Sequence, residues 1–153
     1  ITGRVMEALS LYGVRGNHPA IRKGADYLRR TQEADGSWYG RWGVNYIYGT
    51  WQAVIGPIRC GVNRNESWIQ RAGAWIKSIQ KPDGSFGETA NSYEDTLLKG
   101  TGPSTASQTA WAAMIRLRSR RALGGGVAPM AFSTARIEAM ACTVVQTPQI
   151  LCV

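Results

Sequence analysis

The chain has 153 residues, a formal net charge of +8 and 44% hydrophobic residues, which is the size and apolar content of one ordinary domain. Its basic character would suit nucleic acid, but the aromatic residues do not interleave with the dense basic run at 116–121, so we do not expect nucleic-acid binding. The three cysteines have neither metal-ligand nor disulfide spacing, so no metal site is expected.

Apolar residues at three- and four-residue spacing predict helices along most of the chain. The fourth helix is expected to begin with Ser67 as its N-cap and to stop at Pro82. The other four predicted helices cover residues 3–12, 19–33, 48–55 and 107–117. No strand pattern competes with them, so the predicted fold class is all-α.

One sequence phrase occurs twice, forty-eight residues apart, at residues 23–38 and 71–86. Each copy has a basic residue, a small residue, an aromatic, an aliphatic, a glutamine, an Asp-Gly-Ser turn and a second aromatic at the same offsets. The repeating unit is therefore a helix, a glycine-rich turn and a second helix. Repeated helical hairpins build either an open solenoid or a closed double ring of helices.

The glutamine and the final aromatic of each copy have an expected structural function. Each glutamine follows the last turn of a helix, where its amide can bond backbone groups at a neighbouring helix end. Each aromatic follows the turn and can pack over the same junction. We therefore expect Gln32, Trp38, Gln80 and Phe86 to tie adjacent repeats together.

The two phrases resemble the QW motifs of the triterpene cyclases, and residues 36–51 resemble squalene-hopene cyclases in particular. The resemblance continues over residues 1–5, 82–88, 92–95 and 102–112. Oxidosqualene cyclases resemble the same stretch but typically carry a cysteine where Asn45 stands, which favours the bacterial type and keeps the related oxidosqualene cyclases as an alternative. We interpret the chain as a segment from the C-terminal half of a longer protein.

The resemblance implies a toroidal α/α barrel, present here in part over residues 1–115. It implies cyclisation of squalene to hopene and hopanol through carbocations, without a redox cofactor or a metal. Tryptophan and tyrosine faces can stabilise such cations in a dry cavity. The family also implies a bacterial protein at the cytoplasmic side of the membrane, which takes squalene from the bilayer, and it leaves a homodimer of the full-length protein open.

The aspartate acid of the family lies in an Asp-x-Asp-Asp motif that this chain lacks, so the chain alone is not expected to be the catalyst. Arg4 stands where some family members have a histidine paired to that acid, and the resemblance implies a supporting catalytic role for it. Trp42 is implied as a wall residue of the substrate and cation pocket, together with Tyr46 and Tyr48. The resemblance also places Glu88 and Gln108 between repeats, where we expect them to form hydrogen bonds.

Residues 116–153 depart from the family pattern. They contain an arginine-rich run, three consecutive glycines and a tail rich in Thr, Gln and Val, but no further QW motif. The change is abrupt, and we interpret this aberrant tail as the product of a reading-frame shift, with a degraded gene copy and a genuine new end as alternatives. A weak helix is predicted over 127–145.

Two other function classes fit parts of the sequence. A catalytically inert helical scaffold, descended from a cyclase, could bind an isoprenoid or a partner protein. A protein prenyltransferase subunit would share the helical hairpins, but it should carry zinc ligands, and no plausible set occurs in the sequence.

Overall fold

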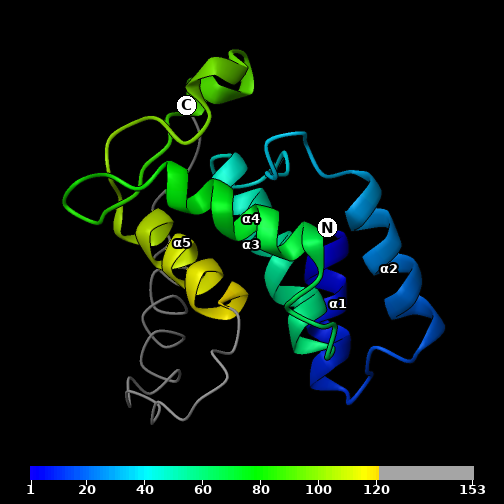
Figure 1. The fold of residues 1–153 in the computed structure, drawn as a ribbon. Helices are drawn as coiled ribbons and strands as arrows, with labels where there is room; N and C mark the ends of the chain where they lie inside the picture. Colours follow the sequence, from blue (N-terminus) through cyan, green and yellow to red (C-terminus); the bar gives the residue numbers. More distant parts are fainter. Residues whose placement is uncertain (121–153) are drawn as a thin grey trace, which may run out of the picture. The chain divides into compact units, whose positions relative to one another are not determined.

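Within residues 1–120, a helix forms at each of the five positions where the apolar spacing predicted one. The computed structural model describes residues 1–120, and this part of the chain contains helices and no strand, which confirms the all-α prediction (Figure 1). The elements are α1 (Thr2–Leu11), α2 (Pro19–Arg30), α3 (Tyr46–Arg59), α4 (Ser67–Ser78), two 3-10 helices, η1 (Ala90–Tyr93) and η2 (Thr96–Leu98), and α5 (Ala106–Ser119).

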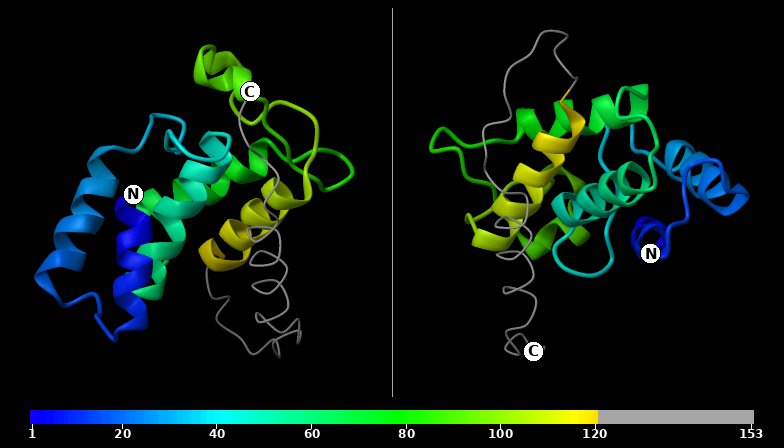
Figure 2. Two further views of the ribbon diagram at one scale, coloured as in Figure 1. Left: turned by 180° about the vertical axis from the view of Figure 1, so that it is seen from behind. Right: turned by 90° about the horizontal axis from the view of Figure 1, so that it is seen from below.

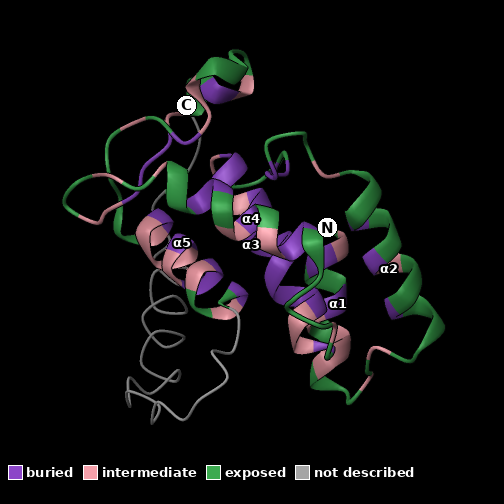
Figure 3. Cartoon of the chain, viewed as in Figure 1, coloured by how far each residue is buried: buried purple, intermediate pink, exposed green. Residues whose placement is uncertain are grey.

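Helix α3 is the centre of the packing. It contacts each of the other four α-helices, and every residue from Gly49 to Pro57 is buried. Helices α1 and α5 pack along it, and α2 and α5 lie on opposite sides of it (Figures 1 and 2). The outer faces of α2 are exposed, whereas α3 is almost wholly buried (Figure 3). Stacked helical hairpins of this kind are the arrangement expected of part of a toroidal α/α barrel.

Several helix ends differ from the prediction, each for a local reason. Helix α2 ends at Arg30 and not at Glu33, and the Leu28 carbonyl of its last turn accepts from the Trp38 indole N–H (2.9 Å) and the Thr31 hydroxyl (3.4 Å). The prediction of Ser67 as an N-cap is wrong, since that residue is already helical and follows the N-cap.

Helix α3 is longer at both ends than the predicted range of 48–55. It begins at Tyr46 because a glutamate from a later loop, described below, accepts the backbone N–H groups of its first turn. It continues past Pro57 to Arg59, since a proline near the end of a helix removes only one hydrogen bond.

The predicted domain boundary at residue 115 falls within α5, which continues to Ser119. The helix predicted over 127–145 lies outside the described residues, as does most of the tail predicted over 116–153. Within residues 1–120, no helix is long and apolar enough to cross a membrane.

Helices α1 and α3 approach each other so closely that a side chain cannot be accommodated at Gly56. A Cβ atom there would lie 2.1 Å from the Gly3 backbone carbonyl oxygen. Replacement of Gly56 by alanine is expected to destabilise the protein by about 1–3 kcal/mol, because two backbones must separate. Urea unfolding of the wild-type and variant proteins measures this difference.

Gly24, in the middle of α2, provides the matched control. A Cβ atom there would lie 2.8 Å from the sulfur of Met6, which is a flexible side chain that can move aside. Alanine also favours a helix over glycine by up to about 1 kcal/mol. Gly24→Ala should therefore be neutral or stabilising, and equal losses for the two variants would contradict the close-approach argument.

Candidate functional site

A pocket of about 620 Å³ opens beside the first turns of α1 and α3. Its walls come from the start of α1, the end of α2, the segment 38–42 and the first turns of α3. Three of the four residues predicted for the site, Arg4, Trp42 and Tyr48, line this pocket. Segments that are distant in the sequence therefore converge on one cavity.

Aromatic rings gather behind the pocket wall. Tyr48 packs on Trp111 with 5.2 Å between ring centroids, and Trp51 stacks on Trp111 at 5.4 Å with an angle of 15° between the planes. Trp51 and Trp111 were not among the predicted site residues. The spacing of three residues between Tyr48 and Trp51 could have indicated that both lie on one helix face.

Arg4 lies next to this aromatic cluster. Its guanidinium carbon is 5.4 Å from the centroid of the Trp51 ring, a cation–π distance. Its Nη1 atom lies 3.7 Å from the Glu7 carboxylate, which also binds Arg59 at 3.1 Å. The family acid that Arg4 is predicted to support is absent from the chain, so this role stays a prediction.

The other two predicted pocket residues differ in their surroundings. Trp42 is 69% exposed on the loop before α3, so its ring is free to contact a ligand. Tyr46 is buried and is not among the residues that line the pocket. Its ring packs edge-on against Tyr39, a lining residue, at 5.8 Å. The role predicted for Trp42 and Tyr46 in contacting substrate stays a prediction.

Glu88 anchors the first turn of α3. Its Oε2 atom accepts hydrogen bonds from the backbone N–H groups of Asn45 (3.3 Å) and Ile47 (2.9 Å). Gln108 accepts from the Glu88 N–H at 3.0 Å and donates to the Glu88 carbonyl at 3.1 Å. The hydrogen bonding predicted for Glu88 and Gln108 between repeats is therefore confirmed, and it holds the helix that carries Tyr48.

The first repeated motif contacts the next helical hairpin through its glutamine. The Gln32 amide nitrogen donates to the Gly36 carbonyl (2.9 Å) and to the Trp68 carbonyl in the first turn of α4 (2.8 Å). Its amide oxygen accepts from Arg71, the basic residue that opens the second motif. The first motif is thus bonded to the start of the second.

The aromatic residues of the two motifs lie over corresponding junctions. Trp38 donates from Nε1 to the Leu28 carbonyl at 2.9 Å and packs edge-on against Trp68 at 6.0 Å. Phe86 is buried, and its backbone N–H donates to the Thr109 hydroxyl of α5 at 3.1 Å. The Gln80 amide donates to the Gly84 carbonyl at 2.9 Å, which repeats the bond from Gln32 to Gly36.

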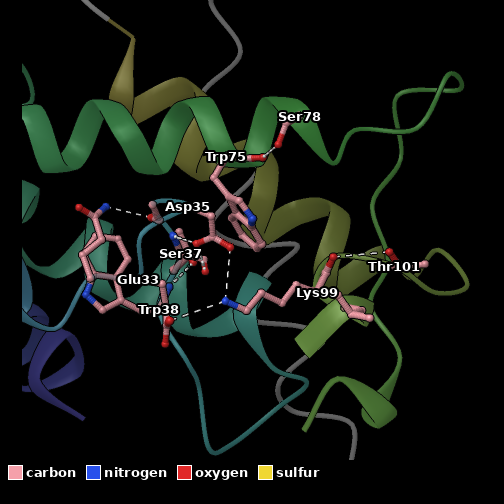
Figure 4. A network of polar contacts seen from close by, with 12 residues as sticks. Glu33, Asp35, Ser37, Trp38, Trp75, Ser78, Lys99 and Thr101 are labelled. Carbon is pink, nitrogen blue, oxygen red and sulfur yellow. Dashed lines mark hydrogen bonds and ion pairs between the residues drawn. The ribbon is translucent and has the colours of Figure 1, made fainter. Parts of the chain in front are cut away.

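A lysine from the loop after η2 joins the turn of the first motif (Figure 4). Lys99 Nζ lies 3.3 Å from Asp35 Oδ2 and 3.7 Å from Glu33 Oε2. Burial alone would raise the pKa of Asp35, but hydrogen bonds from Ser37 and the charge of Lys99 outweigh it, so the pKa of the Asp35 carboxyl is lowered. The ionised form of this carboxyl is therefore favoured in the folded protein.

This lowered pKa predicts a loss of stability in acid. Because the pKa of Asp35 is lower in the folded than in the unfolded protein, its contribution is fully present above the unfolded value of about 4 and is lost as the pH falls through the folded value. Asp35→Asn should therefore lower the free energy of unfolding at pH 7. It should also reduce the further loss of that free energy as the pH falls below about 4. Urea unfolding at several pH values measures both effects.

Asp83, the corresponding residue of the second motif, is the control for this experiment. Ser85 hydrogen bonds lower its pKa too, and the charge of Lys81 adds to them, but no lysine hydrogen bond does. The pH dependence should therefore change less in Asp83→Asn than in Asp35→Asn. An unchanged acid slope in Asp35→Asn would contradict the prediction.

Within residues 1–120, no group of three or more His, Cys, Asp or Glu side chains is arranged to hold a metal ion. The one cysteine in this part of the chain, Cys60, is buried and donates from Sγ to the Met6 carbonyl at 3.1 Å. Burial raises the pKa of the Cys60 thiol, which disfavours its nucleophilic thiolate form.

Comparison with known proteins gives one consistent family. The model of the squalene-hopene cyclase C-terminal domain matches residues 1–125. A probable squalene-hopene cyclase of Sinorhizobium fredii is 46% identical over 114 residues, which are 73% of this chain and 18% of that protein. The squalene-hopene cyclase of Zymomonas mobilis is 44% identical over 114 residues, 73% of this chain and 17% of its own length.

The squalene-hopene cyclase of Alicyclobacillus acidocaldarius is 44% identical over 122 residues, which cover 80% of this chain and 19% of that protein. The chain thus spans about a fifth of the length of the curated relatives it matches.

Proposed function

Because the chain belongs to the squalene-hopene cyclase family, we propose that it forms part of the wall of a cavity in which squalene is cyclised to hopene and hopanol. The observation that carries this proposal is the aromatic cluster of Tyr48, Trp51 and Trp111 behind a pocket of about 620 Å³. Aromatic faces stabilise a positive charge without offering it a nucleophile.

In this proposal the chain's residues have two tasks. Trp42 and Tyr48 contact the hydrocarbon and the cations formed along it, and Arg4 supports the carboxylate network around the acid. The acid itself comes from a part of the cyclase that this chain does not contain, since its aspartates form no Asp-x-Asp-Asp motif. Protonation of a terminal double bond of squalene by that acid starts the reaction, and each ring closure moves the cation along the squalene molecule.

A chimera tests the proposal without requiring the chain to fold by itself. In this chimera, residues 1–120 of the chain replace the matched segment of the Alicyclobacillus squalene-hopene cyclase. We expect it to convert squalene to pentacyclic products that gas chromatography with mass spectrometry detects. A second chimera that carries the matched Zymomonas segment is the control. The Zymomonas and Alicyclobacillus proteins are each 44% identical to this chain over the matched residues.

The proposal would be contradicted if the chimera unfolded cooperatively, as the control does, but formed no cyclised product. The inert-scaffold alternative would then be favoured. Cyclised products from both chimeras, at rates within about tenfold of each other, would support a working cavity wall.

We further propose that the full-length protein works at the cytoplasmic surface of a bacterial membrane and takes squalene from the bilayer. The net charge of +8 on the 153 residues of this chain supports the proposal, since basic surfaces are attracted to anionic lipid headgroups. Sedimentation of the full-length protein with vesicles that contain anionic lipid tests the proposal, and binding that does not depend on anionic lipid would count against it. A homodimer is proposed from the family alone, and equilibrium sedimentation tests it.

A further inference from the structure

Lys99 connects the loop after η2 to the segment that leads into the pocket. Its side chain is 17% exposed, and its ammonium group lies 3.3 Å from Asp35 Oδ2 (Figure 4). The same ammonium lies 4.2 Å from the centroid of the Tyr46 ring. One cation thus binds the turn of the first motif and the first residue of α3 at once.

Tyr46 transmits this contact to the pocket wall. Its ring packs edge-on against Tyr39 at 5.8 Å, and Tyr39 packs edge-on against Tyr93 at 5.7 Å. Tyr39 lines the pocket, and the segment 39–48, which contains Tyr39 and Tyr46, also carries Trp42 and Tyr48, which line it too. Lys99 does not line the pocket, so any effect on a ligand must pass through this segment.

We propose that Lys99 is a positioning residue that holds the segment 39–48 in place and thereby determines how far the cyclisation proceeds. This inference rests on the proposed cyclase function. A cation that the wall holds closely continues to the next ring closure. A cation that is held loosely transfers a proton to water: the C–H bond beside the cation breaks, its electrons form a C=C bond, and the proton leaves as hydronium. Loosening the segment should therefore increase the share of partly cyclised products.

The second motif supplies a matched control residue. Lys81 occupies the position that corresponds to Glu33, and its Nζ atom binds the Gly102 carbonyl and the Ser104 hydroxyl, both at 2.7 Å. It therefore anchors the same loop that carries Lys99, through Gly102 and Ser104 and not through Tyr46 of segment 39–48. A variant of Lys81 loosens the loop without removing the cation from Tyr46.

The test compares Lys99→Met, Lys99→Arg and Lys81→Met in the chimera. In Lys99→Met we expect the share of partly cyclised products to rise about tenfold, which corresponds to the loss of one well-placed cation contact. Lys99→Arg keeps the charge and its contact with an aromatic face, so its products should stay close to those of the unmodified chimera. Lys81→Met should lower the melting temperature without changing the product ratio.

A second measurement follows the segment itself and needs no activity. Arg41 is exposed within the segment 39–48 and offers a site for trypsin. Native cleavage after Arg41, followed by mass spectrometry, should be about tenfold faster in Lys99→Met than in the unmodified chimera, and unchanged in Lys81→Met. Should Lys99→Met fail to fold, Lys99→Gln, which keeps a polar donor, takes its place.

Each outcome separates the inference from the proposed function. If the unmodified chimera makes no product, the proposed function fails, and cleavage after Arg41 still decides whether Lys99 holds the segment. If Lys99→Met loses stability but keeps both its product ratio and its cleavage rate, the inference is overturned. It is also overturned if Lys81→Met shifts the products as much as Lys99→Met does, since general loosening of the loop would then be the cause.

Discussion

Replacement of Trp38 by alanine is expected to destabilise the fold by about 3–5 kcal/mol, among the largest losses of any single substitution in residues 1–120. Trp38 is only 5% exposed, and its ring fills the junction between α2 and α4 through the contact with Trp68. Its indole N–H also satisfies the Leu28 carbonyl at the end of α2. Urea unfolding measures the loss as a change in the midpoint at constant slope.

Two other substitutions divide this loss into its parts. Trp38→Phe keeps most of the ring but removes the donor to Leu28, and should cost about 1–2 kcal/mol. Trp42→Ala removes an indole that is 69% exposed, so it should change stability by less than about 1 kcal/mol. If Trp38→Ala proved as mild as Trp42→Ala, the motif aromatic would have no role at the junction.

The repeat made the architecture predictable. Two phrases at equal offsets require two equivalent hairpins, and the apolar spacing placed a helix at each expected position. Helix ends were less predictable, because they depend on single hydrogen bonds. At the end of α2, the side chains of Thr31 and Trp38 donate to the Leu28 carbonyl, whereas the sequence pattern of an amphipathic helix continues past this point.

The site was predictable only where the resemblance reached it. Arg4, Trp42 and Tyr48, which the resemblance singled out, line one pocket, and the roles implied for them stay predictions. The contacts of Lys99 with Asp35 and Tyr46 join residues more than fifty positions apart, and no periodicity connects them. Such contacts depend on the path of a loop, which hydrophobic spacing does not determine.

Neighbouring residues that were predicted to share a role can have different surroundings, as Tyr46 shows. It lies two residues before Tyr48 and was assigned the same role, but residues two apart on a helix point in different directions. Tyr48 lines the pocket, whereas Tyr46 faces Tyr39 and Lys99. The side chains of the two tyrosines therefore have different surroundings, although both lie in the first turn of α3.

Replacement of Glu88 by alanine is expected to cost about 3–5 kcal/mol, from the loss of two hydrogen bonds to its side chain, and to reduce cyclisation in the chimera. Glu88 is 4% exposed, and its Oε2 atom is the acceptor for the N–H groups of Asn45 and Ile47. Without it, two buried donors at the start of α3 lose their partner, and the negative charge that favours a helix N-terminus is removed. Thermal unfolding and the rate of squalene conversion measure the two consequences.

Glu88→Gln separates the charge of the side chain from its shape. Glutamine keeps one oxygen that can accept from Asn45 and Ile47, so it should cost only about 1–2 kcal/mol. Cyclisation should follow the same order as stability, because the first turns of α3 carry Tyr48 and Trp51 into the aromatic cluster. A glutamine variant as damaged as the alanine variant would mean that the negative charge, and not the hydrogen-bonding oxygen, holds the helix. Unchanged stability in both variants would contradict the anchoring role of Glu88 altogether.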